Sequence, residues 1–120
     1  MGPTVLVVDD QPAFRAVARD LLESDGFVVV GEAADGRSAL EQSAALSPDV
    51  VLLDVRLPDL SGLDVARALR DVAGSPMVVL TSTVDYTPAV PSCGARAFIA
   101  KAALSGSALR AALTPSVLRP

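Results

Sequence analysis

The run Val5-Leu6-Val7-Val8-Asp9-Asp10 decides the fold of this chain, together with its counterpart Val50-Val51-Leu52-Leu53-Asp54. Each is a short apolar stretch typical of a strand that is buried on both faces of a parallel sheet. Each ends in aspartate, and the carboxyl ends of strands are where open α/β sheets bind ligands. If the two strands are neighbours, Asp9, Asp10 and Asp54 converge on one small volume. Such carboxylates repel one another unless a cation joins them or one takes up a proton, and Mg²⁺ is a hard cation suited to oxygen ligands.

Length and composition limit the function classes. The 120 residues suit one domain, which we expect to span residues 1–120, with a tail or the start of a linker over 114–120. The net charge of −4 argues against a nucleic-acid-binding surface. Cys93 is the only cysteine, which excludes an internal disulfide and favours a cytoplasmic location. No apolar stretch approaches membrane-spanning length, so we expect no membrane partner.

The chain contains no histidine. This excludes a Ser-His-Asp triad, histidine metal ligands and a role as phosphohistidine donor. Any chemistry must therefore use carboxylates, hydroxyls and an amine, and Lys101 is the only lysine.

Apolar runs and helical stripes alternate along the chain, which predicts a parallel sheet covered by helices on both faces. The predicted strands cover residues 5–8, 27–30, 50–53, 77–80 and 97–99, and the predicted helices cover 12–24, 36–46, 63–72 and 106–113. In the first helix, an apolar stripe is expected to face the sheet and charged residues the other side: Phe14, Val17, Ala18, Leu21 and Leu22 against Arg15, Arg19 and Glu23.

The segment between the fourth and fifth predicted strands breaks this pattern. Pro88 and Pro91 interrupt the place where a full helix is expected, and Gly94 follows closely. Because proline is tolerated only in a first helical turn, we expect a short or distorted fourth helix of about one turn. A regular multi-turn helix here would contradict this prediction.

Five sequence marks occur in order: the pair Asp9-Asp10, Asp54, Thr81, Phe98 and Lys101. With these residues, and with Pro58 and Gly62 following Asp54, the chain resembles the receiver domain of bacterial two-component response regulators. The segment 102–113 is most similar to the NarL/LuxR-type subfamily. The resemblance implies an α/β, flavodoxin-like, doubly wound sheet of five parallel strands in the order 2-1-3-4-5, with about five helices.

The resemblance also implies the chemistry. Asp54 would accept a phosphoryl group from a sensor histidine kinase in a Mg²⁺-dependent reaction, and Lys101 would contact the phosphoryl oxygens. Thr81 would turn its hydroxyl toward the phosphoryl group, and Phe98 would rotate inward as the second switch residue. The domain would take part in its own phosphorylation and dephosphorylation but turn over no external substrate.

The same resemblance implies how Mg²⁺ is held and which partners are involved. Asp10 and Asp54 would bind the ion directly, Asp9 largely through water, and the backbone carbonyl of Arg56 would supply another ligand. A homodimer is among the expected partners, and DNA would be bound only through an output domain that these residues do not include. We therefore expect a stand-alone or excised receiver that controls an output such as transcription.

Three alternatives bear on this hypothesis. The altered fourth helix favours a phosphorylation-independent interaction or dimerisation domain. The presence of all three aspartates, Asp9, Asp10 and Asp54, together with Lys101 argues against it. A phosphohydrolase of the haloacid dehalogenase type would need an acid two residues after the nucleophile, where Arg56 stands. Flavin binding is disfavoured because Asp9 and Asp10 would repel the flavin phosphate in a loop without hydroxyl donors.

Overall fold

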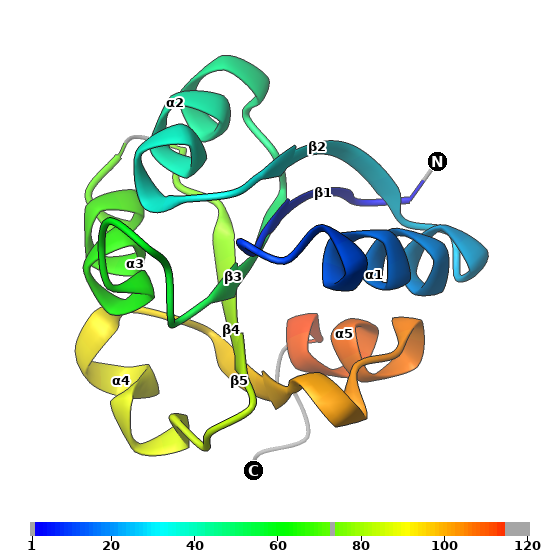
Figure 1. Cartoon of the computed structure of the whole chain (residues 1–120). Coiled ribbons are helices and arrows are strands. Elements are labelled where there is room, and N and C mark those ends of the chain that lie inside the picture. Colours follow the sequence, from blue (N-terminus) through cyan, green and yellow to red (C-terminus); the bar gives the residue numbers. More distant parts are fainter. Residues whose placement is uncertain (1, 73, 115–120) are drawn as a thin grey trace, which may run out of the picture.

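Five parallel strands form one sheet in the order β2-β1-β3-β4-β5 in the computed structural model, which describes residues 2–72 and 74–114 (Figure 1). The strands are β1 (Thr4–Val8), β2 (Val28–Ala33), β3 (Val50–Asp54), β4 (Met77–Ser82) and β5 (Ala97–Ala100). The predicted flavodoxin-like order is confirmed. In this order β1 and β3 are neighbours, and the chain reverses its winding direction between them.

The helices cover both faces of the sheet. They are α1 (Pro12–Ser24), α2 (Gly36–Leu46), α3 (Gly62–Arg70), α4 (Val90–Cys93) and α5 (Gly106–Leu113), with short 3₁₀ turns η1 (Thr87–Ala89) and η2 (Lys101–Ala103). Figure 1 shows α1 and α5 on one side of the sheet and α2, α3 and α4 on the other. Among the described residues, no helix is both long and apolar enough to cross a membrane.

Alternate residues of the central strands supply two separate cores. Val5 and Val7 of β1 pack with α1 and α5, whereas Leu6 and Val8 pack with α2 and α3. All four side chains are at most 1% exposed. A strand that is apolar on both faces is thereby fully used, as the continuous apolar runs predicted.

Several local predictions need correction. In α1, Val17 and Leu21 are 53% and 36% exposed, so the helix buries a narrower stripe than predicted. Arg15 does not point away from the sheet but pairs with Glu32 on β2. Strand β2 itself continues to Ala33, three residues beyond its predicted end. Val72 lies after the end of α3 and is exposed. The predicted tail over 114–120 lies outside the described residues except for Thr114.

The fourth helix is short, as predicted. One 3₁₀ turn, η1, leads directly into α4, which has four residues and ends at Gly94. Gly94 has a φ of +79°, a left-handed conformation that glycine adopts without strain. Pro88 and Pro91 each stand in a first turn of one of these segments, where proline removes no helical hydrogen bond.

Candidate functional site

The three aspartates singled out in the sequence meet at the carboxyl ends of β1 and β3. One carboxylate oxygen from each of Asp9, Asp10 and Asp54 lies within 4.8 Å of the other two. Asp9 is fully buried, Asp54 is 3% exposed and Asp10 is exposed. Above them is an open pocket of about 400 Å³ whose lining includes Asp10, Asp54, Arg56, Ser82, Thr83 and Lys101. The predicted convergence is therefore present, with Asp9 beneath the pocket rather than on its surface.

Asp9 is held in the loop between β1 and α1. Its backbone N–H donates to the carbonyl of Ala33 at 3.0 Å, and its carboxylate Oδ1 accepts from the Gln11 backbone N–H at 2.8 Å. The residue that caps the N-terminus of α1 is Gln11, not an aspartate, and its side chain makes no capping hydrogen bond. The acidic pair thus does not serve as a helix cap, which is a common structural role of aspartate.

Lys101 begins η2 directly after β5 and inserts its ammonium between two carboxylates. Its Nζ lies 2.7 Å from Asp9 Oδ2 and 3.3 Å from Asp54 Oδ2. The contact with Asp9 is an ion pair at short range without ideal hydrogen-bond geometry, since Asp9 Oδ2 has no hydrogen-bond partner among the described residues. The same ammonium lies 4.6 Å from the centre of the Phe14 ring on α1, a favourable cation–π distance.

The surroundings of Asp54 and Lys101 shift the pKa values of both side chains. Burial raises the pKa of the Asp54 carboxyl, and repulsion from Asp9 adds to the rise, against the opposing Arg56 N–H and Lys101. Burial lowers the pKa of Lys101, but its contacts with Asp9 and Asp54 outweigh this, so the pKa is raised. The charged form of Lys101 is therefore favoured by its two carboxylate neighbours, whereas the charged form of Asp54 is disfavoured by its surroundings.

Thr81 lies on β4, directly opposite Asp54 in the ladder between β3 and β4. Thr81 is fully buried, and its hydroxyl Oγ1 has no hydrogen-bond partner among the described residues. A buried hydroxyl without a partner costs free energy in a folded protein, so such a group calls for an explanation such as an absent ligand. The small neighbour Ser82 lines the pocket.

The loop after Asp54 is closed by a glycine. Gly62 donates its N–H to the carbonyl of Val55 at 2.8 Å, and Arg56 forms an isolated antiparallel bridge with Ser61. A Cβ at Gly62 would overlap the carbonyl oxygen of Asp54. Only glycine lets α3 begin this close to the candidate acceptor. The Arg56 N–H also donates to Asp54 Oδ1 at 3.1 Å, which fixes the carboxylate orientation.

Phe98, the second predicted switch residue, does not line the pocket. It lies on β5 opposite Leu80, is partly buried, and packs against the core cluster that also contacts Tyr86 and Val90. It is thus placed on the face that α4 covers, between the sheet and the altered segment.

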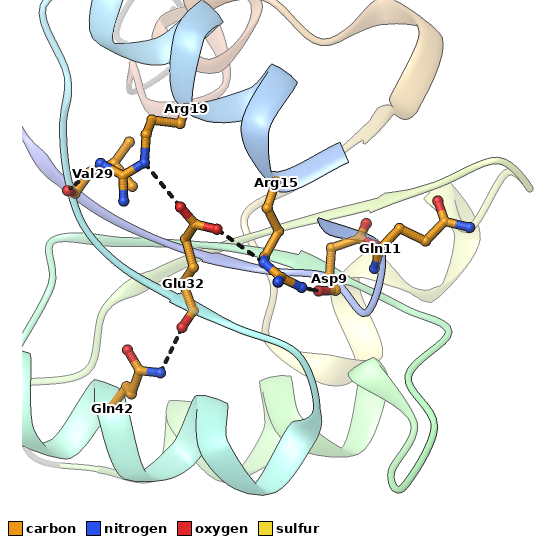
Figure 2. A network of polar contacts seen from close by, with 7 residues as sticks. All are labelled: Asp9, Gln11, Arg15, Arg19, Val29, Glu32 and Gln42. Carbon is orange, nitrogen blue, oxygen red and sulfur yellow. Dashed lines mark hydrogen bonds and ion pairs between the residues drawn. The ribbon is translucent and has the colours of Figure 1, made fainter. Parts of the chain in front are cut away.

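The sequence reasoning missed Arg15 and Glu32. Figure 2 shows the guanidinium of Arg15 between the Glu32 carboxylate and the backbone of Asp9. An arginine on an amphipathic helix is usually solvent-facing, and no spacing in the sequence indicates that this one turns toward β2. The polar Glu32 near the end of an apolar strand was the available signal.

Comparison with known proteins gives consistent results. The family model for the response regulator receiver domain matches residues 5–114. The chain is 44% identical over 115 residues to protein-glutamate methylesterase/protein-glutamine glutaminase 5 of Myxococcus xanthus, covering 95% of this chain but 30% of that protein. It is 32% identical over 104 residues to chemotaxis protein CheY of Thermotoga maritima, covering 84% of this chain and 87% of that one.

Among solved structures, the signal receiver domain assigned to NarL of Mycobacterium tuberculosis superposes with a TM-score of 0.84 at 35% identity. The match covers 95% of this chain and 98% of that domain. In three of the curated relatives the match covers only 48%, 30% and 35% of their length, so the chain spans about half or less of these proteins.

Proposed function

The chain belongs to the receiver domains of two-component response regulators, and from this premise we propose that Asp54 accepts a phosphoryl group from a sensor histidine kinase. The observation that carries the proposal is the buried, unpartnered hydroxyl of Thr81 on the strand that pairs with Asp54. A phosphoryl group on Asp54 would bring acceptor oxygens to this hydroxyl. The sole lysine of the chain already contacts the same carboxylate.

The transfer forms one bond and breaks one. A carboxylate oxygen of Asp54 attacks phosphorus, the bond from phosphorus to the donor nitrogen breaks, and the donor imidazole keeps the electron pair. Arg56 N–H holds Oδ1, and Lys101 is positioned to move from Oδ2 to a phosphoryl oxygen. Because burial raises the pKa of Asp54, its carboxylate is less stabilised in the ground state and more nucleophilic.

The donor set fits a hard divalent cation. Asp9, Asp10 and Asp54 present three oxygens within 4.8 Å of one another, and Mg²⁺ takes oxygen ligands. Asp10 and Asp54 line the pocket and would bind Mg²⁺ directly, the buried Asp9 would act from below, and Arg56 would contribute its carbonyl. When bound, Mg²⁺ would neutralise negative charge on the phosphoryl oxygens during the transfer of the phosphoryl group.

We propose that Thr81 and Phe98 transmit the change to the surface. The Thr81 hydroxyl would turn toward the phosphoryl group, and Phe98 would move inward on the neighbouring strand. The helical segment that covers Phe98 is short, because it consists only of η1 and the four-residue α4. The output surface formed there therefore differs from one built on a full helix, whatever output the parent protein controls.

The experiment is intact-mass spectrometry after incubation with Mg²⁺ and acetyl phosphate. The expected result is the gain of one phosphoryl group that is lost in Asp54→Asn and abolished by a chelator. Asp59→Asn is the matched control, because Asp59 is an exposed acid of the same loop that accepts hydrogen bonds from α2. Phosphorylation of Asp54→Asn to the same extent would refute Asp54 as acceptor.

A protein that gains no phosphoryl group should then be tested with beryllofluoride, whose binding is followed by amide chemical shifts of Thr81 and Ser82. Absence of both phosphorylation and beryllofluoride binding would favour the interaction-only alternative. That alternative has one observation of its own, the shortened α4.

A further inference from the structure

We propose that Arg15 is a positioning residue for the acidic pocket. Its guanidinium, braced by Glu32, fixes the backbone at Asp9 and thereby sets where the Asp9 and Asp10 carboxylates point. The inference rests on the proposed function, since the purpose of this placement is the binding of a divalent cation. It assigns a role to a pair, Arg15 and Glu32, that does not line the pocket.

The carbonyl of Asp9 lies between the last residue of β1 and the first hydrogen-bonded carbonyl of α1. Strand β1 ends at Val8, and the helical hydrogen bonds of α1 begin when the Arg15 N–H donates to the carbonyl of Gln11. The Asp9 carbonyl therefore belongs to neither ladder, yet Asp9 is fully buried. A buried carbonyl needs a donor, and Arg15 Nη1 supplies it at 2.5 Å.

The guanidinium is itself held in place (Figure 2). Arg15 Nε donates to Glu32 Oε1 at 3.0 Å, and Arg19 Nε donates to the other oxygen, Oε2, at 2.9 Å. Glu32 in turn accepts at its backbone carbonyl from Gln42 Nε2 of α2 at 2.6 Å. The side chain of Arg15 is 17% exposed, so this ion pair is better shielded than an ordinary surface pair.

A β-bulge explains why Glu32 can reach α1 at all. Val5 of β1 pairs with Val29, but the next residue, Leu6, pairs with Gly31, so the register shifts by one residue of β2. Val29 packs in the α1 and α5 core although Ala33, four residues later, packs in the opposite core. The bulge thus reverses the alternation and turns Glu32 to the same face as Val29. A regular strand would have aimed this carboxylate at α2.

Arg19 provides a contrast within the same network. It shares Glu32 with Arg15, pairs with Glu23 at 3.1 Å and reaches the Val29 carbonyl at 3.5 Å. Its described contacts do not include the loop after β1. Removing Arg19 weakens the support of Glu32, whereas removing Arg15 also leaves the Asp9 carbonyl without its donor.

The test compares Arg15→Met with Arg19→Met in the full chain. Calorimetric titration with Mg²⁺ alone gives the affinity, because the chain has no tryptophan to report binding. We expect Arg15→Met to weaken Mg²⁺ binding about tenfold, the size of effect typical of residues that orient metal ligands, and Arg19→Met to leave it unchanged. Arg15→Lys keeps one donor and should retain more of the affinity than Arg15→Met.

A second readout needs no metal. The Gln11 N–H donates to Asp9 Oδ1, so its hydrogen exchange reports the order of the loop. Exchange at Gln11 should accelerate in Arg15→Met but not in Arg19→Met, measured relative to Leu52 in the centre of β3, which reports global unfolding. If Arg15→Met and Arg19→Met behave alike in both readouts, the positioning role is overturned. A wild-type chain that binds no Mg²⁺ would overturn the proposed function, and exchange at Gln11 would then decide alone whether Arg15 orders the loop.

Discussion

Replacing Lys101 with Met removes the cation that separates two buried carboxylates. Its Nζ lies 2.7 Å from Asp9 and 3.3 Å from Asp54, and its side chain is 14% exposed. At an effective dielectric constant of about 20, these distances correspond to attractions of about 6 and about 5 kcal/mol, from which the desolvation of the ammonium must be subtracted. Breaking a buried ion pair by removing one partner costs about 3–5 kcal/mol, which we take as the expected loss of unfolding free energy.

The loss should depend on pH and on Mg²⁺. Lys101 lowers the pKa of Asp54, so without it the pKa of this carboxyl rises further above its usual value. The deficit of Lys101→Met should therefore shrink as falling pH protonates Asp54. Mg²⁺ bound to the carboxylates would replace the missing charge, so saturating MgCl₂ should stabilise Lys101→Met more than the wild type.

Urea unfolding followed by far-UV circular dichroism, with and without MgCl₂, measures these differences. Asp9→Asn provides the control background, because Lys101→Met should cost less once its nearest carboxylate is neutral. The electrostatic reasoning is refuted if Lys101→Met unfolds within 1 kcal/mol of the wild type at neutral pH without metal, or if its cost is the same in the Asp9→Asn background.

Other changes have outcomes that the structure fixes. Asp54→Asn should raise the melting temperature at neutral pH, because it removes a carboxylate whose pKa is raised by burial; the gain should vanish below the ordinary carboxyl pKa of 3.8, where the wild-type side chain is protonated in the folded and unfolded states. Gly62→Ala should lower the unfolding free energy by about 1–3 kcal/mol in a urea titration, because its Cβ would overlap the Asp54 carbonyl; unchanged stability would contradict the close approach. Ser105→Ala should cost about 1 kcal/mol by loss of the α5 cap on Ala108 N–H, with Mg²⁺ affinity unaffected in the same calorimetric titration.

The fold could be predicted from the sequence because its strands are buried on both faces. A run such as 50–53 is apolar at every position, and only a central parallel strand uses all of these side chains. Gly26, which has a φ of +92°, and Ser105, which accepts from the Ala108 N–H, mark helix ends by local chemistry that needs no tertiary information. The short α4 followed equally from the steric rule for proline.

The errors lie where tertiary contacts override local patterns. The stripe of α1 appeared wide because Val17 and Leu21 are apolar, but the helix meets the sheet along Ala18 and Leu22 and leaves the others exposed. The second strand appeared to end at Val30 because Gly31 and Glu32 are not typical of a buried strand. Its continuation depends on pairing with β1 across a bulge, which the sequence of β2 alone does not specify.

Tertiary contacts also hold the loop after β1, although this loop places Asp9 next to the buried carboxylate of Asp54. Asp9 and Asp54 are buried next to each other, an arrangement that loosens a loop unless other contacts hold it. Those contacts come from outside the pocket: Ala33 holds the Asp9 N–H, and Arg15 holds its carbonyl. Charge repulsion at the carboxylates is therefore opposed by hydrogen bonds to the backbone of the same loop. The backbone of the loop after β1 is thus held by contacts that do not involve the three carboxylates themselves.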